Sequence, residues 1–146
     1  MTEWIVKEFK DLSLQELYSI FQLRMQVFIV EQNCPYQDAD NKDQFCHHLM
    51  GWVDGTLAAY IRIVSPGISY SEPSIGRVVT SSRYRATGLG KSLMQKGIET
   101  TRSLYGEVPI RIGAQLYLQR FYESFGFKKQ GEIYLEDGIQ HVEMVL

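Results

Sequence analysis

The sequence is poor in cysteine and lacks any long apolar run. Only two of its 146 residues are cysteines, Cys34 and Cys46, and no stretch approaches the roughly 18 to 20 apolar residues that a membrane-spanning helix needs. Two thiols do not imply a disulfide framework, and charges interrupt the apolar residues of the N-terminus, unlike those of a secretory signal. We therefore expect a cytoplasmic protein with reduced cysteines and no membrane partner.

A strong charge of either sign is also missing. The formal net charge is −2, the sequence pI is about 5.9, and charged residues make up 22% of the chain. Nucleic-acid-binding domains usually carry a strongly basic face, so DNA and RNA are not expected partners. The composition is that of an ordinary globular protein. Its length suits one domain with its own hydrophobic core, and we expect residues 1–146 to form that domain.

The apolar pattern predicts a chain of alternating strands and helices without repeats or linkers. Strands are predicted at 3–9, 47–53, 57–64, 74–80 and 109–114, and a hairpin at 127–146. Helical spacing predicts helices over 14–28, 89–105 and 115–126. Ser13 and Glu16 form a capping box for the first helix, and Asp54-Gly55 and Asp137-Gly138 suit tight hairpin turns. The order indicates an α+β or mixed α/β layer fold.

The stretch RYRATGLGKSLM, residues 83–94, has features of a phosphate-binding loop. A Walker A loop would need glycine where Arg85 stands, and a dinucleotide fingerprint would need glycine where Leu93 stands, so neither motif fits. A predicted strand, a glycine-containing turn and a long helix nevertheless follow one another here. Free backbone N–H groups and the helix dipole favour an anion at such a junction. Residues 83–102 also carry five basic residues and one acid.

Four segments resemble the GCN5-related N-acetyltransferases (GNAT). Arg85 to Gly90 matches [QR]-x-x-G-x-[GA], the coenzyme A pyrophosphate loop of that family, and lies between a strand and a helix as it does there. QLYLQRFYESFGF, residues 115–127, resembles the later helix with its "fYe..GF" pattern. VFIVEQNCPYQDAD and EDGIQH are similar to the ElaA-like branch of the family. The resemblance extends over essentially all 146 residues.

The resemblance implies a fold and an activity. The fold would be a central mixed, mostly antiparallel sheet with a V-shaped splay between its fourth and fifth strands, flanked by helices. The activity would be transfer of an acetyl group from acetyl-CoA, as cosubstrate, to a small-molecule or peptide amine that attacks the thioester directly in a ternary complex. The alternative is a non-catalytic acyl-CoA-binding sensor or interaction module on the same fold. Many members dimerise, so a homodimer is compatible with the resemblance.

The resemblance also implies roles for individual residues. Coenzyme A would contact the strand at Val78, Val79 and Thr80, and the loop at Arg85, Ala86, Thr87, Gly88, Leu89, Gly90 and Lys91. Gln115 stands where many relatives carry asparagine, and we expect it near the cofactor. Tyr122 matches the tyrosine of the "fYe" pattern, which protonates the departing thiolate. The alternative for Tyr122 is an aromatic core residue.

The acceptor side is less defined, because the family has no fixed general base. We assign Glu31 as the catalytic carboxylate, with Asp38, Asp40, Glu136 and His141 as the other candidates for the general base. We expect acceptor contacts from Glu31, Asp38, Asp40, His48, Glu136 and His141. Residues 31–43 hold four acids and one base, so this segment should attract a cationic amine. The alternative is a solvated acidic loop. Adjacent strand residues point to opposite faces, so at most one of His47 and His48 should face the acceptor.

Metal binding and covalent catalysis are not expected. DADNKDQFCHHL lacks the glycine and final glutamate of a calcium loop. Cys34, Cys46, His47 and His48 do not have zinc-site spacing. Acyl transfer through a thioester at Cys34 is a minor alternative, and otherwise Cys34 is a small buried residue.

Overall fold

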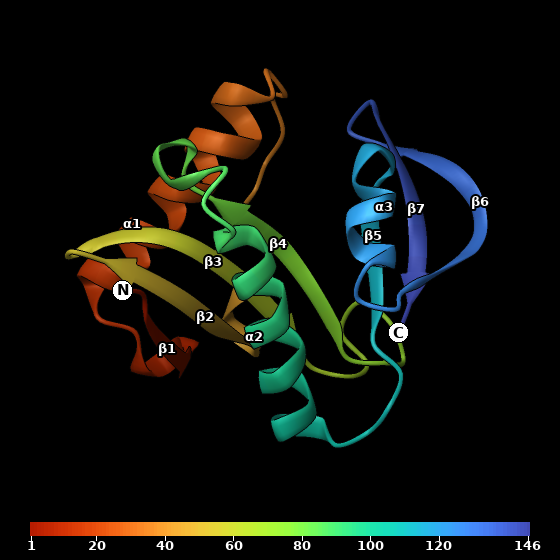
Figure 1. Ribbon diagram of the computed structural model, residues 1–146, viewed down its shortest axis with the longest axis horizontal. Coiled ribbons are helices and arrows are strands. Elements are labelled where there is room, and N and C mark those ends of the chain that lie inside the picture. Colours follow the sequence, from red (N-terminus) through yellow and green to blue (C-terminus); the bar gives the residue numbers. More distant parts are fainter.

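Two antiparallel sheets with helices on their faces make up the computed structural model, which describes residues 1–146 (Figure 1). The first sheet has the order β1-β2-β3-β4 and the second the order β5-β7-β6. The strands are β1 (Glu3–Glu8), β2 (Cys46–Val53), β3 (Thr56–Val64), β4 (Ser74–Thr80), β5 (Arg111–Gln115), β6 (Lys128–Glu136) and β7 (Ile139–Val145). The helices are α1 (Leu14–Arg24), α2 (Leu89–Tyr105) and α3 (Gln119–Glu123). None of these helices is both long and apolar enough to cross a membrane.

The local signals of the sequence are confirmed at turns and at one helix start. Both turn residues have positive φ in the hairpin at Asp54 (48°) and Gly55 (78°), and again at Asp137 (52°) and Gly138 (77°). Positive φ at both central residues matches the twist of the flanking strands. The capping box before α1 is present, with reciprocal bonds between Ser13 and Glu16. These features depend only on neighbouring residues.

Two predicted helices differ from the observed ones. The helix expected over 14–28 changes at Met25 into a π-helical segment, Met25–Glu31, with i→i−5 bonds such as Cys34 N–H to Ile29 O at 3.1 Å. Such segments often occur at functional sites. The helix expected over 115–126 is divided into one 3₁₀ turn, Leu116–Leu118, and the short α3. Apolar spacing alone does not distinguish these variants from a continuous α-helix.

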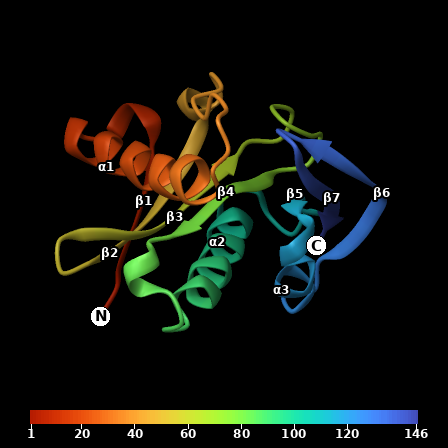
Figure 2. The same ribbon diagram turned by 90° about the horizontal axis from the view of Figure 1, so that it is seen from above.

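Strand β3 supplies the centre of the hydrophobic core because it is covered on both faces. Helices α1 and α2 lie on opposite faces of the first sheet (Figure 2). Successive strand residues alternate between the faces, so Ala59 and Ile61 pack in the cluster with α2, and Tyr60 packs in the cluster with α1. The result is a nearly continuous run of buried residues along β3.

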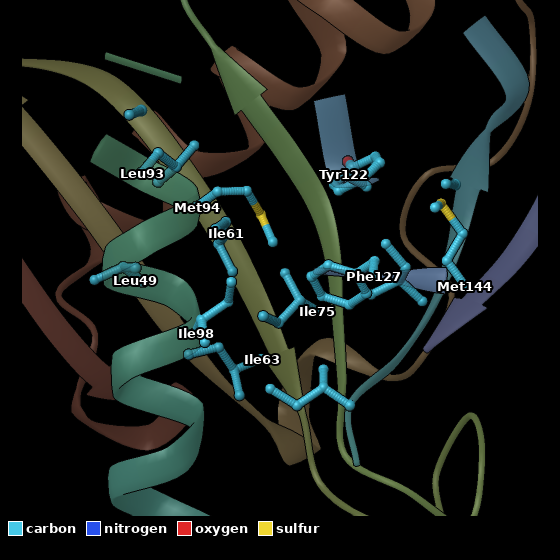
Figure 3. Packing of buried hydrophobic residues seen from close by; sticks show 14 of the residues in the cluster. Leu49, Ile61, Ile63, Ile75, Leu93, Met94, Ile98, Tyr122, Phe127 and Met144 are labelled. Atoms are coloured by element: carbon cyan, nitrogen blue, oxygen red, sulfur yellow. The ribbon is translucent and has the colours of Figure 1, made fainter. Parts of the chain in front are cut away.

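One core cluster joins the two sheets. Ile75 of β4 and Leu93 of α2 pack in the same cluster as Met144 of β7 and Phe127, the residue before β6 (Figure 3). Gly97 allows α2 to approach the sheet closely, since a Cβ there would lie 2.7 Å from the side chain of Ile61. Shared burial of this kind holds the two sheets together although no strand ladder connects them.

Strands β4 and β5 start side by side and then run apart, as Figure 1 shows. A hydrogen bond of 3.1 Å from Arg111 N–H to Pro73 O joins the segments where they meet. Beyond it the two strands share no ladder, and Arg77 of β4 has a positive φ of 50° where the β3–β4 register shifts. A bulge of this kind bends a strand and disrupts its pairing. The expected α+β architecture and the V-shaped splay between the fourth and fifth strands are thereby confirmed.

Candidate functional site

A cavity of about 1040 Å³ fills the splay between the two sheets. Every residue of β4 from Ser74 to Thr80 lines it, and Ile112, Gly113 and Gln115 of β5 line the opposite side. The π-helical segment contributes Val27, Phe28 and Glu31, and the hairpin of β6 and β7 contributes Tyr134, Glu136, Asp137, Ile139 and His141. The cavity therefore extends along the whole length of β4.

At one end of the cavity, the loop before α2 presents consecutive backbone N–H groups without acceptors. No backbone amide from Ala86 to Lys91 donates to a protein backbone group, and the first bond of the helix is Ser92 N–H to Gly88 O at 3.1 Å. Ala86 (φ 63°) and Gly88 (φ 82°) are both left-handed. Successive amides in such turns form a concave anion site. The N-terminus of a 17-residue helix adds partial positive charge.

Arg85, the first residue of this loop, pairs with Glu31. One guanidinium nitrogen lies 2.8 Å from Glu31 Oε1, and another donates to Thr80 O at 3.1 Å. Glu31 is therefore placed in the cavity, as expected, but one of its carboxylate oxygens is engaged by the arginine. Its assignment as the catalytic base stays a prediction.

Tyr122 lies both in the core and at the cavity, and its role as the proton donor stays a prediction. Tyr122 is 6% exposed and packs edge-on against Phe121 and Phe127, with ring centroids 5.2 and 6.0 Å away. Figure 3 shows its ring beside Phe127. It also lines the cavity. Burial raises the pKa of Tyr122 above its ordinary value near 10. The phenol therefore keeps its proton at neutral pH, as a proton donor must.

The remaining predicted cofactor residues lie between the loop and the splay. Val78, Val79 and Thr80 line the cavity on β4. Gln115, at the end of β5, exchanges amide hydrogen bonds of 3.3 Å with Gln32 just after the π-helical segment. Gln115 thereby connects the two walls of the cavity. The contacts of these residues with a cofactor stay predictions.

The aspartates of the predicted acidic segment are not free to meet a cation, because they form ion pairs with arginines. Arg24, Arg62 and Arg77 alternate with Asp38, Asp40 and Asp43 in what we call the arginine–aspartate network. Arg24, fully buried, lies 2.7 Å from both Asp38 and Asp43. Arg62 donates two bonds to Asp40, at 2.8 and 2.9 Å. The expectation that this segment attracts cations by its net charge is therefore corrected.

The structure does not place Asp38 and His48 among the cavity-lining residues, which corrects their assignment as acceptor contacts. Asp38 is 3% exposed, and its carboxylate accepts bonds from Arg24, Arg77 and Tyr36. His48 lies between Tyr60 Oη at 2.7 Å and the Asp43 carbonyl at 2.9 Å. Burial lowers the pKa of His48, so the ring is neutral. Both residues hold the acceptor wall in place from behind.

We expect the network to make stability dependent on pH. Burial tends to raise the pKa of Asp40, but hydrogen bonds from Arg62 outweigh it and bring the value to about 2, whereas an unfolded chain has about 3.9. The unfolded state then binds the proton first, so this contribution is present above pH about 4 and is lost as pH falls toward about 2. Urea unfolding across this range should show a steeper fall for the natural protein than for Asp40→Asn.

Asp11→Asn is the control, because Asp11 forms no ion pair with an arginine, and it should keep the slope of the natural protein. Equal slopes for Asp40→Asn and the natural protein would contradict the role of the Arg62 pair.

Glu136 and His141 come together on the second hairpin, at the cavity. His141 Nε2 is 3.5 Å from Glu136, and Nδ1 is 2.8 Å from the carbonyl of Ile139. A carbonyl only accepts, so Nδ1 carries the hydrogen, and the lone pair of the neutral ring is on Nε2. Tyr134 stacks on the ring at 5.7 Å. A neutral imidazole with a free lone pair and a neighbouring carboxylate can accept a proton.

Sequence patterns missed several cavity residues. Lys42, Ser69, Tyr70 and Tyr134 line the end of the cavity distant from the glycine loop. A Cβ at Gly113 would lie 2.8 Å from Tyr134 Oη and 3.2 Å from Tyr70 Oη, so the missing side chain gives both hydroxyls room. These residues come from separate segments, and no local motif connects them.

The two cysteines are free and buried. Cys34 lines the cavity, and its thiol donates to the carbonyl of Asp137 at 3.5 Å. Burial raises the pKa of Cys46 to about 11, which makes it a poor nucleophile. No three His, Cys, Asp or Glu side chains form a group that could hold a metal ion.

The splay, the glycine loop and the helix order are those of a known class. The family model described as acetyltransferase (GNAT) domain matches residues 9–146, so the chain belongs to the GNAT acetyltransferase family. ElaA of Escherichia coli K12 is 43% identical over 146 residues, which cover 99% of this chain and 95% of ElaA. The crystal structure of E. coli ElaA superposes with a TM-score of 0.93 at 42% identity, covering 99% of both chains.

Two further solved structures share the fold. An acyl-CoA N-acyltransferase from Pseudomonas aeruginosa has a TM-score of 0.95 at 44% identity, covering 99% of both chains. An aminoglycoside 6'-N-acetyltransferase complexed with coenzyme A has a TM-score of 0.72 at 16% identity, covering 97% of this chain and 96% of that one. The resemblance to the GNAT family and its ElaA-like branch is thereby confirmed.

Proposed function

We propose that this protein transfers an acetyl group from acetyl-CoA to a primary amine, by direct attack of the amine in a ternary complex. The observation that carries the proposal is the run of free amides from Ala86 to Lys91 at the mouth of a cavity that follows β4. An anion-binding loop joined to a long, partly apolar channel suits a ligand with a pyrophosphate and a pantetheine arm. A protein of the same fold binds coenzyme A.

The chain has residues suited to both the pyrophosphate and the pantetheine arm of this cosubstrate. The amides from Ala86 to Lys91 would hold the pyrophosphate, with Gly88 and Gly90 leaving the backbone uncovered by side chains. Val78, Val79 and Thr80, on the β4 edge that has no ladder partner, would hold the pantetheine arm, with Gln115 opposite. Bound acetyl-CoA supplies a thioester whose acyl carbon is the electrophile.

The side chains at the cavity supply the proton transfers. His141 accepts a proton from the amine through the lone pair on Nε2, and Glu136 stabilises the imidazolium that results. The amine nitrogen bonds to the acyl carbon, the carbon–sulfur bond breaks, and Tyr122 donates its phenolic proton to the departing thiolate. His141 is preferred to Glu31 because Glu31 is paired with Arg85. No residue forms a covalent intermediate.

Thiol release tests the function directly. Purified protein is incubated with acetyl-CoA and a panel of primary amines, and free thiol is followed with a colorimetric reagent. We expect acceptor-dependent release with at least one amine. Binding of acetyl-CoA without release for any amine would overturn the enzyme assignment and favour a non-catalytic acyl-CoA sensor.

The role of His141 makes a separate prediction. His141→Gln retains a polar side chain but cannot accept a proton, so kcat at neutral pH should fall by about tenfold or more, while acetyl-CoA affinity stays the same. The matched control is His47→Gln, because His47 does not line the cavity. An unchanged kcat in His141→Gln would remove His141 from the mechanism.

A further inference from the structure

Lys42 is a positively charged residue beside the arginine–aspartate network that does not pair with an acid. The three arginines of the network compensate its three aspartates. Lys42 lies between Asp40 and Asp43 in the sequence, yet its ammonium forms a side-chain hydrogen bond with a neutral group, Ser69 Oγ, at 3.2 Å. Lys42 and Ser69 both line the cavity. This wall of the acceptor end therefore carries one uncompensated positive charge.

Arg62 lies in the same wall and is held there by Asp40 and Asp43. It is 4% exposed and lines the cavity, and its terminal nitrogens are bound to Asp40 and Asp43. Its Nε hydrogen has no acceptor within the protein. A buried donor without a partner is costly and uncommon in a native structure. The Nε atom is itself covered by protein atoms and offers no contact to a ligand in the cavity, so Lys42 carries the open positive charge of this wall.

The opposite wall of the cavity carries negative charge. The hairpin of β6 and β7 contributes Glu136, Asp137 and His141 to the cavity and contributes no lysine or arginine. Between the two walls, the hydroxyls of Tyr70 and Tyr134 come together over Gly113. The acceptor end is therefore dipolar, with donors on the side of Lys42 and acids on the side of Glu136.

We infer that the acceptor of the proposed transferase is a small amino acid, with its carboxylate bound at Lys42 and its amine directed to His141 and Glu136. This inference rests on the proposed function and defines its substrate class. A zwitterion matches both walls at once, because each of its charges meets the opposite sign. A polyamine would place a second cation against Lys42, which the site disfavours.

The test uses matched acceptors that differ only at the carboxyl group. Each L-amino acid is compared with its amide and with the amine left by removing its carboxyl group. Binding is measured by calorimetry on the protein alone and saturated with coenzyme A, and turnover is measured by thiol release from acetyl-CoA. We expect at least one acid to bind about tenfold more tightly than both partners, equivalent to about 1.4 kcal/mol.

Variants of Lys42 assign that preference to the site. Lys42→Gln should remove most of the advantage of the acid over its amide, and Lys42→Arg should largely retain it, because arginine keeps the charge. Lys129→Gln is the control, since Lys129 is exposed on β6 outside the cavity. If Lys42→Gln keeps the full preference, or if no acid binds better than its amide, the inference is wrong.

The inference and the proposed function fail in different ways. Amino acid binding that depends on Lys42, without thiol release, would support the site and contradict the transferase. Thiol release with amines and amides as good as that with acids would support the transferase and contradict the amino acid site. The absence of both binding and release would contradict both.

Discussion

Replacing Gly88 with valine is expected to weaken acetyl-CoA binding by about 100-fold, the equivalent of losing two charge-assisted hydrogen bonds. Gly88 has a φ of 82° and caps α2 at its N-terminus. A β-branched residue at this φ is strongly disfavoured, so the loop must change its backbone. The amides from Ala86 to Lys91 would then no longer point at a common anion. Calorimetric titration with acetyl-CoA measures the effect.

Gly131→Val is the matched control for that variant. Gly131 has a similar φ of 78°, is exposed, and lies in β6 outside the cavity. It should suffer comparable backbone strain and lose little affinity for acetyl-CoA. Unchanged affinity in Gly88→Val would remove the loop from the cofactor site, whereas equal losses in both variants would indicate a general loss of stability.

Tyr122→Phe is expected to reduce kcat by about 100-fold, within the range that removal of a positioned general acid produces. The ring stays, so the packing against Phe121 and Phe127 is preserved. Only the hydroxyl that protonates the thiolate is lost, and acetyl-CoA affinity should change little. Steady-state thiol release and calorimetric titration give the two quantities separately.

Tyr18→Phe controls for loss of a hydroxyl elsewhere, because Tyr18 is 68% exposed on α1. Its kcat and its affinity for acetyl-CoA should match those of the natural protein. If Tyr122→Phe loses cofactor affinity and turnover to the same extent, Tyr122 supports the structure of the site and is not the proton donor.

The strand, turn and helix start around the proposed cofactor loop could be predicted from the sequence because their signals are local, whereas the cofactor assignment itself came from the family resemblance. The strand Ser74–Thr80, the glycine turn and the helix start at Leu89 follow one another within a single segment. The hairpin turns at Asp54-Gly55 and Asp137-Gly138 depend in the same way on adjacent residues. Backbone preferences of neighbouring residues determine such features before any tertiary contact forms.

The acceptor end could not be predicted, because its partners come from distant segments. Asp38 and Asp40 appear as free acids in the sequence, whereas Arg24, Arg62 and Arg77 reach them from α1, β3 and β4. The sum of charges over a segment ignores such pairing. The π-helical segment Met25–Glu31 was missed for a related reason, since the same apolar spacing fits an α-helix.

The pairing of the aspartates with arginines changes which compounds should be screened first as substrates. The acidic segment by itself would favour screening cationic amines without a carboxylate. With the aspartates paired to arginines, the site inferred at Lys42 would favour an acceptor with a negative group beside its amine. Amino acids, their amides and their decarboxylated amines are therefore the first compounds to compare.

The most direct test of the cofactor assignment is calorimetric titration of the purified protein with acetyl-CoA, because binding at the loop before α2 is required by every later step. We expect one molecule to bind per chain with micromolar affinity, and we expect Gly88→Val to abolish most of that affinity while Gly131→Val retains it. No binding of acetyl-CoA at millimolar concentration would contradict both the cofactor site and the proposed transferase.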